Sequence, residues 1–486
     1  MDDVQKKRLF ILCDGTWQDG VNSKFPLTNV ATLARCLSPV DDDNCLQLVY
    51  YDNGVGNVTG KISVGIDGAT GRGISAKIRN AFSFLSHNYN FDRLNRDEAD
   101  EIVLAGFSRG AFAVQCIASF MSQIGLLRSC HLYYLRGLYT LWSHQDFKRF
   151  GPGDPNPVGT TLADYVKKLS DEGILYRVKI KALVVWDTVS ALGLPIHPPP
   201  RPLSFVGKQV PSIVENAFQA LALDERRRKF TPRVWLSKEE GTSHVKQCWF
   251  RGTHADVGGN GDAALGTVTL LWVLGQLRAA QIGIAVENLE VGKHLNQKFL
   301  EWGFDINRVL GQFKETSVLS SISGPGKPTK PAAYWWLLGM ESRGKYLGSR
   351  SDDDHSVSMQ IHFSVRLAMA NGEKCAPLAK WRTTFRNDKA EWISGASVIP
   401  ECELSRTADG YLISDELDEY GWIQAWYERW YAVAYTERSE FAQELRDLVV
   451  ENGVSHGRLS AFAEMLQKNM KVENGKLAPT AVYPSL

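Results

Sequence analysis

Three features are missing from this 486-residue chain, and each absence excludes a class of protein. No apolar run reaches the roughly 20 residues that a membrane-spanning helix needs, and the strand-like run Leu9–Leu12 is too short for a signal-peptide core. The eight cysteines include no Cys-x-x-Cys pair, which disfavours a zinc site and a disulfide framework. The formal net charge of +1 gives no electrostatic reason to expect nucleic-acid binding. We therefore expect a cytoplasmic protein with reduced, mostly buried thiols.

Length and composition indicate a globular protein with more than one folding unit. A hydrophobic content of 44% with 22% charged residues is ordinary, but 486 residues exceed what one core usually serves. A Gly/Pro-rich stretch at 323–331 predicts a boundary between a large domain at 1–322 and a C-terminal lobe at 323–486 that packs on or caps it. The aromatic and Gly/Pro-rich segment at about 129–176 is predicted to be an insertion or cap.

Alternating strand and helix patterns predict an α/β fold. Apolar runs at Leu9–Cys13, Leu46–Tyr51, Ile102–Ala105, Ile180–Trp186 and Val245–Phe250 are typical of strands. Helical patterns cover Val30–Leu37, Gly73–Tyr89 and Pro211–Leu223. Thr28-Asn29 offers an N-cap to the first, and the second carries an apolar stripe from Ile74 to Leu85. This order predicts a doubly wound, mostly parallel sheet, in which functional residues gather at the carboxyl ends of strands.

A serine stands at a predicted strand-to-helix turn. Ser108 lies in the pentapeptide Gly106–Gly110, a Gly-x-Ser-x-Gly motif that follows the run Ile102–Ala105 and precedes a helical pattern. Such a turn projects the hydroxyl clear of the backbone, and the flanking glycines allow close approach of chain and substrate. Ser108 is therefore a candidate nucleophile, with an ordinary turn serine as the alternative.

A serine nucleophile needs a base and an acid. His254 is the leading base because it lies in a glycine-rich loop directly after the last predicted strand. Asp187, at the end of another predicted strand, would be the acid in the chain order Ser, Asp, His. Asp256 is the alternative acid, although a carboxylate two residues from the histidine rarely faces its Nδ1 atom.

The loop after the first strand is a candidate oxyanion and pocket element. Asp14, Gly15 and Thr16 follow that strand, and a backbone N–H of Gly15 or Thr16, together with that of Arg109, would form an oxyanion hole. The simpler interpretation is that Asp14 and Thr16 only cap a turn.

Several motifs in this order resemble a known family. They are Leu12–Trp17, Thr28–Val30, Tyr51–Gly56, Gly106–Ala111, Trp186–Val189 and His254–Gly259, with later pieces at Tyr334–Gly339 and Ile361–Arg366. The resemblance runs from about Arg8 to about Ala280. It is to the α/β-hydrolase family named for the type VI secretion phospholipase effectors, formerly a domain of unknown function and common in fungi. It implies serine ester hydrolysis by Ser108 and His254, with a phospholipid or another lipophilic ester as substrate.

The sequence thus predicts a serine hydrolase that cleaves carboxylic esters of lipids or phospholipids with Ser108, His254 and Asp187. It implies no metal or organic cofactor. Two rivals stay open: an acyltransferase or thioesterase with the same residues, and a non-catalytic interaction protein that keeps the fold. Aromatic residues concentrate in the C-terminal third, at Tyr334–Leu338 and at Trp422, Trp426 and Trp430. They are interpreted as core packing, as a lid over the Ser108 pocket or as a surface for peripheral membrane contact.

Overall fold

The computed structural model of the chain describes most of the first 282 residues and shorter parts of the remainder. The described residues are 5–15, 27–41, 43–54, 72–92, 99–145, 161–189, 203, 205–238, 244–280, 282, 328–330, 339–347, 359–362, 364–365, 369, 374–386 and 389–402. Among them, no helix combines the length and apolar character needed to cross a bilayer.

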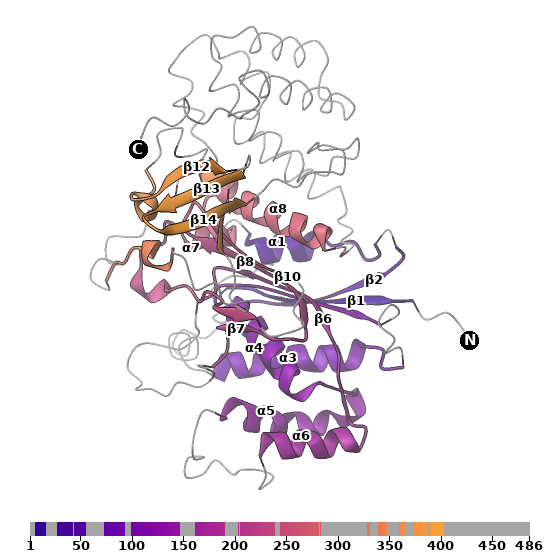
Figure 1. Cartoon of the computed structure of the whole chain (residues 1–486). Coiled ribbons are helices and arrows are strands. Elements are labelled where there is room, and N and C mark those ends of the chain that lie inside the picture. The colour runs from indigo at the N-terminus through magenta and orange to yellow at the C-terminus, as the bar shows by residue number, and fades with distance from the viewer. Residues whose placement is uncertain are drawn as a thin grey trace, which may run out of the picture.

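A ten-stranded sheet forms the centre of the molecule (Figure 1). Its order is β12-β13-β14-β11-β10-β8-β6-β3-β1-β2, and every pairing from β14 to β2 is parallel. The strands are β1 Lys7–Cys13, β2 Leu46–Asp52, β3 Glu101–Phe107, β6 Ile180–Trp186, β8 Val214–Ala222, β10 His244–Phe250, β11 Met359–His362, β12 Arg382–Arg386, β13 Lys389–Ser394 and β14 Ser397–Cys402. All five predicted strands are therefore confirmed, as is the mostly parallel α/β class.

The prediction of a helix at Pro211–Leu223 is wrong. This segment contains β8, which lies between β6 and β10 in the sheet. Successive side chains alternate between faces, so that Phe218 and Ala220 pack in one apolar cluster while Ala217 and Leu221 pack in others. A strand buried on both faces reads as a nearly continuous apolar run, and periodicity alone does not separate such a run from a buried helix.

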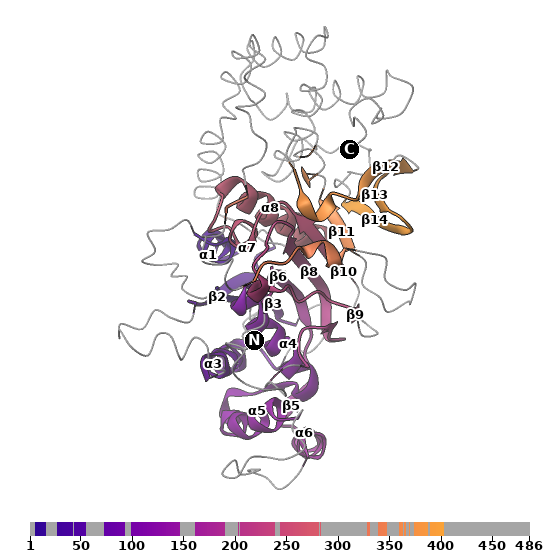
Figure 2. The same ribbon diagram turned by 90° about the vertical axis from the view of Figure 1, so that its left-hand side faces the viewer.

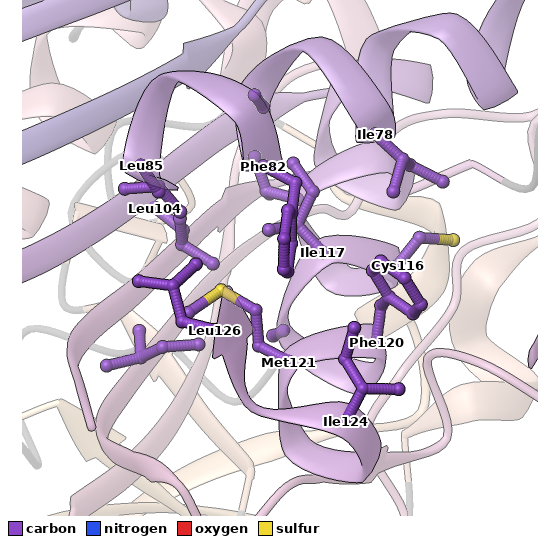
Figure 3. Close-up of a cluster of buried hydrophobic side chains, with 14 of the residues drawn as sticks. Ile78, Phe82, Leu85, Leu104, Cys116, Ile117, Phe120, Met121, Ile124 and Leu126 are labelled. Atoms are coloured by element: carbon purple, nitrogen blue, oxygen red, sulfur yellow. The ribbon is translucent and has the colours of Figure 1, made fainter. Parts of the chain in front are cut away.

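Helices cover both faces of the sheet, as the doubly wound prediction requires (Figure 1). Helices α1 (Asn29–Cys36) and α8 (Ala263–Ala279) lie on one face, and α3 (Arg72–Asn88) and α4 (Arg109–Ile124) lie on the other. The predicted N-cap is confirmed, because the Thr28 side chain accepts a hydrogen bond from the Ala31 N–H. Figure 3 shows the apolar contact between α3 and α4, where the predicted stripe residues Ile78, Phe82 and Leu85 meet Ile117 and Phe120.

The described parts of the segment at 129–176 form an outer layer on the α3 and α4 side of the molecule (Figure 2). Its described elements are η1 Ser129–Tyr134, α5 Leu135–Ser143, α6 Leu162–Asp171 and β5 Leu175–Tyr176, the last paired with β4 Leu126–Leu127. Buried Leu138 and Trp142 of α5 belong to the same apolar cluster as α3 and α4. The segment is thus continuous with the main core.

Residues beyond 323 contribute to the same sheet. Strands β11 and β14 continue the parallel array from β10, and β12 and β13 add an antiparallel edge. The division of the chain at 323 stays a prediction, and the C-terminal aromatic residues, including Trp335, Trp336 and Trp422, lie outside the described residues.

Candidate active site

The candidate residues meet at the carboxyl end of the parallel strands, beside the point where the strand order reverses. Strand β1 has β2 on one side and β3 on the other, which makes it a topological switch point of the kind that hosts ligand sites in α/β sheets. Ser108 follows β3, Asp187 follows β6, and His254 follows β10. Residues far apart in the chain therefore converge because their strands are parallel neighbours or near neighbours.

Ser108 occupies a strained turn between β3 and α4. Its φ of 58° and ψ of −120° are unusual for a non-glycine residue, and such a conformation costs on the order of 1–3 kcal/mol. Its backbone is held on both sides: the N–H donates to the Trp186 carbonyl at 3.0 Å, and the carbonyl accepts from the N–H groups of Phe112 and Val189, each at 3.3 Å. The surrounding sheet and helix thus maintain the strain that presents the hydroxyl.

The two glycines of the motif permit this turn to pack closely. A Cβ atom at Gly110 would lie 2.1 Å from the Cys13 carbonyl oxygen, and one at Gly106 would lie 2.6 Å from the Gly110 carbonyl oxygen. Neither position has room for a side chain. The Gly-x-Ser-x-Gly pattern is therefore required by contacts between β3, α4 and the end of β1.

His254 lies between the serine and an acid. Its Nε2 atom is 2.7 Å from Ser108 Oγ, and its Nδ1 atom is 2.7 Å from Asp187 Oδ2. The ring is buried between Phe107 and Phe230, with ring centroids 4.7 and 4.8 Å away. His254 is also the first residue of α7 (His254–Gly258), where its backbone N–H donates to Glu225 Oε2 at 3.2 Å.

Asp187 is fully buried and accepts hydrogen bonds at both carboxylate oxygens. Oδ1 accepts from the Ala222 N–H at 3.0 Å and from Arg343 Nη1 at 2.5 Å, while Oδ2 faces His254 and accepts from Arg343 Nη2 at 3.0 Å. Burial alone would raise the pKa of this carboxyl, but the charge of Arg343 and the hydrogen bonds from His254 and Arg343 hold it well below its ordinary value. Asp187 is thus ionised and oriented.

Asp256, the alternative acid, performs a different task. Its Oδ2 atom accepts from the Thr253 N–H at 2.8 Å and from the Thr329 N–H at 2.9 Å, and its Oδ1 atom accepts from the Asp262 N–H at 2.8 Å. With Thr253 it forms the capping box that begins α7. The Asp256 carboxylate accepts hydrogen bonds from backbone N–H groups, whereas the Asp187 carboxylate contacts the His254 ring.

The loop after β1 contacts the serine but uses its polar groups locally. A Cβ atom at Gly15 would lie 3.4 Å from Ser108 Cβ, so this glycine brings the loop against the turn. The Gly15 N–H, however, donates to Asp14 Oδ1 at 2.6 Å. The expectation that Gly15 offers an oxyanion donor is therefore not met in this structure, because a buried carboxylate takes that N–H group. Thr16 lies outside the described residues.

Asp14 links the loop to the neighbouring elements. Its Oδ2 atom accepts from Thr28 Oγ1 at 2.7 Å and from Tyr51 Oη at 2.6 Å. Burial raises the pKa of the Asp14 carboxyl in spite of these hydrogen bonds. Arg109, the first residue of α4, places its backbone N–H directly after Ser108 in the first helical turn, where the N–H groups of a helix favour negative charge.

Sequence reasoning missed three residues that contact the site. Arg343 binds Asp187, Glu225 accepts from the His254 backbone, and Phe230 packs on the imidazole. Although burial acts to raise the pKa of Glu225, hydrogen bonds and the charge of Arg227 lower it. None of the three belongs to a motif with a chemical signature, so the only available signal is charge and aromaticity in loops next to strands.

In the described parts of the chain, no cluster of three or more acidic, histidine or cysteine side chains could hold a metal ion.

The parallel sheet with helices on both faces, and the serine on a strand-to-helix turn, define an α/β-hydrolase-like protein. Residues 7–276, more than half of the chain, match the family described as the type VI secretion system (T6SS) phospholipase effector Tle1-like catalytic domain. The chain belongs to this family.

Individual relatives are distant. Over 242 residues the chain is 28% identical to the uncharacterized protein YEL023C of Saccharomyces cerevisiae, and the match covers 45% of this chain and 33% of the yeast protein. The solved structure of the Tle1 effector bound to the VgrG spike of the type 6 secretion system is 18% identical, with a TM-score of 0.29 over 52% of this chain and 51% of that chain. An uncharacterized protein from Pseudomonas aeruginosa is 17% identical, with a TM-score of 0.30 over 58% of this chain and 46% of that chain. The chain thus spans about a third of the yeast protein and about half of each solved chain.

Proposed function

We propose that this protein is a serine hydrolase that cleaves carboxylic esters of lipids through an acyl-enzyme. The observation that carries the proposal is the continuous series from Ser108 Oγ through His254 to Asp187, with both contacts at 2.7 Å. These are distances at which a general base takes a proton from a nucleophile and an acid orients the base. The strained turn and the buried acid further support this assignment.

In the first half of the reaction, Ser108 Oγ attacks the acyl carbon while His254 Nε2 takes the hydroxyl proton. The proton then passes from His254 to the leaving alcohol as the ester C–O bond breaks, which leaves the acyl group on the serine. In the second half, His254 takes a proton from water as the water oxygen attacks the acyl carbon. The bond between the acyl carbon and Ser108 Oγ then breaks, His254 returns the proton to Ser108 Oγ, and the carboxylic acid departs. Asp187 holds the imidazole with Nδ1 protonated throughout, so that Nε2 can accept.

The tetrahedral intermediate carries a negative charge that needs hydrogen-bond donors. We assign the Arg109 backbone N–H as one donor, because it directly follows the nucleophile at the N-terminus of α4. Thr16 is the remaining candidate for the second donor, since the Gly15 N–H binds Asp14.

The substrate class rests on family membership. The family is described as phospholipase effector-like, which favours a phospholipid or a related lipophilic ester. Phe107 and Phe230 beside the imidazole give the site an apolar wall compatible with an acyl chain. Peripheral contact with membranes and a cytoplasmic location are further proposals; activity on vesicles and cell fractionation test them.

Active-site labelling tests the proposal. The full chain is treated with a fluorophosphonate probe, which reacts with an activated serine. Wild type is expected to be labelled, Ser108→Ala is expected to be unlabelled while folded, and Ser119→Ala, on the same helix α4, is the matched control that keeps labelling. Equal labelling of wild type and Ser108→Ala would contradict the mechanism.

Product analysis separates the rivals. Wild type that has not been treated with the probe should release free fatty acid from phospholipid vesicles and should turn them over faster than a short soluble ester. If an alcohol or thiol is added and becomes acylated while no free acid forms, the protein is an acyltransferase. If only acyl thioesters are hydrolysed, it is a thioesterase. A folded wild type with neither labelling nor turnover would favour the non-catalytic interaction protein.

A further inference from the structure

Arg343 makes a two-point contact with the acid of the proposed catalytic series. It is 2% exposed, and its Nη1 and Nη2 atoms bind Asp187 Oδ1 and Oδ2 at 2.5 and 3.0 Å. The same two nitrogens donate to the backbone carbonyls of Ala222 at 2.7 Å and Phe230 at 2.6 Å. The guanidinium therefore spans the end of β8, the acid and the loop that covers the imidazole.

The backbone around Arg343 is attached to this same loop. The Arg228 N–H donates to the Gly339 carbonyl at 3.1 Å, and the Glu341 N–H donates to the Arg226 carbonyl at 2.7 Å. Arg343 begins the short helix η4 (Arg343–Tyr346), which Ser342 caps through a hydrogen bond from the Gly344 N–H at 3.3 Å. Arg343 thus reaches Asp187 from a segment beyond residues 7–276, the part of the chain that matches the family.

The charges facing His254 in the described structure are balanced in pairs. Asp187 is matched by Arg343, and Glu225, which accepts from the His254 backbone, is matched by Arg227 through contacts of 2.6 to 2.9 Å. The Arg227 guanidinium also lies 3.8 Å from the ring centroid of Phe230, the same ring that packs on the imidazole. An unbalanced carboxylate beside an imidazole favours the protonated ring, and an arginine on that carboxylate opposes this effect.

We infer that Arg343 is a positioning residue for the reaction proposed above: it holds Asp187 in the orientation that His254 requires, and its charge offsets that of the aspartate beside the imidazole. A segment beyond the family-matched region thereby completes the active site. This inference rests on the proposed function.

The experiment compares three variants of the full chain by their pH profiles. Arg343→Met removes the charge, Arg343→Lys keeps the charge but loses the two-point geometry, and Arg226→Met removes an exposed arginine of the adjoining loop as the matched control. For each variant, kcat and kcat/KM on a soluble ester are measured from acid to alkaline pH, and folding is checked by thermal unfolding.

The expected result is a change in the shape of the profile. For Arg343→Met the acid limb should move to higher pH by about one unit, because the uncompensated Asp187 charge stabilises the imidazolium. For Arg343→Lys the acid limb should stay close to that of wild type, while kcat falls at least about tenfold because a lysine is a single-point donor. The control should match wild type.

Two results would overturn the inference. One is a folded Arg343→Met protein whose rate is lowered by the same factor at every pH, which indicates structural support alone. If Arg343→Met does not fold, Arg343→Lys decides: wild-type kcat in that variant excludes a need for the two-point geometry. Failure of the proposed function itself is distinguishable, because it appears as absent Ser108 labelling in wild type.

Discussion

Replacement of Asp187 by asparagine separates catalytic geometry from packing, because the two side chains have nearly the same shape. The carboxylate accepts from four donors: Ala222 N–H, His254 Nδ1–H and both Arg343 nitrogens. An amide has a single oxygen, so its NH₂ group must face two of them. If the NH₂ group faces His254, the imidazole carries its proton on Nε2 and can no longer accept from Ser108.

The expected loss of turnover follows from this tautomer change. In enzymes with this arrangement, an acid-to-amide change lowers turnover on the order of 10⁴-fold, or about 5.4 kcal/mol at roughly 1.36 kcal/mol per tenfold. The substitution also leaves the buried Arg343 without its counter-charge, and breaking a buried pair costs about 3–5 kcal/mol of stability. Asp187→Asn should therefore be both nearly inactive and less stable.

The assay pairs Asp187→Asn with Asp256→Asn. Both variants lose a buried carboxylate, but the partners of Asp256 among the described residues are Thr253, Thr329 and Asp262 rather than the His254 ring. Asp256→Asn should lower the unfolding temperature and keep turnover within about tenfold of wild type when measured well below that temperature. Ester turnover and thermal unfolding are measured side by side for both proteins.

The reasoning is refuted if the ranking reverses. An Asp187→Asn protein that remains folded and keeps more than about a tenth of wild-type turnover would show that Asp187 does not orient His254. An Asp256→Asn protein that stays folded but loses turnover would show that Asp256, not Asp187, is the acid.

Three other predictions concern stability. Gly110→Ala should lower the free energy of unfolding by at least about 3 kcal/mol, because its Cβ would lie 2.1 Å from the Cys13 carbonyl oxygen; a loss below about 1 kcal/mol in urea titration would contradict the close approach. Ser108→Gly should be more stable than Ser108→Ala by about 1 kcal/mol, because glycine accepts the φ of 58° without strain; equal thermal midpoints would refute that strain. Burial lowers the pKa of His362 to about 3, below the unfolded value of about 6.5, so the unfolded chain binds the proton first as pH falls. Stability should then fall by about 1.4 kcal/mol per pH unit between roughly pH 6 and 4, and an unchanged slope in His362→Asn would exclude this origin.

Local patterns were sufficient for much of the fold. The five predicted strands are present, and the stripe from Ile74 to Leu85 is buried on α3, because apolar periodicity reports directly which side chains face a core. The Gly-x-Ser-x-Gly turn could also be predicted, since the constraint that excludes a side chain at Gly106 arises where one strand enters one helix. The constraint at Gly110 comes from the backbone of Cys13 and Asp14 at the end of β1, and only the folded chain shows it. The order of Ser108, Asp187 and His254 at strand ends followed from the parallel arrangement.

Contacts between distant segments required the three-dimensional arrangement. Strand β8 was mistaken for a helix because burial on both faces removes the alternation that marks a strand, yet this strand supplies the Ala222 N–H to Asp187. The Asp14 carboxylate that takes the Gly15 N–H is held by hydrogen bonds from Thr28 and Tyr51, which lie on other elements of the fold. Arg343 lies 156 residues from Asp187 in the chain, and an isolated arginine in a loop carries no pattern that identifies its partner. A buried charge is matched by whichever opposite charge the fold brings within hydrogen-bond distance, and that distance exists only once the chain has folded.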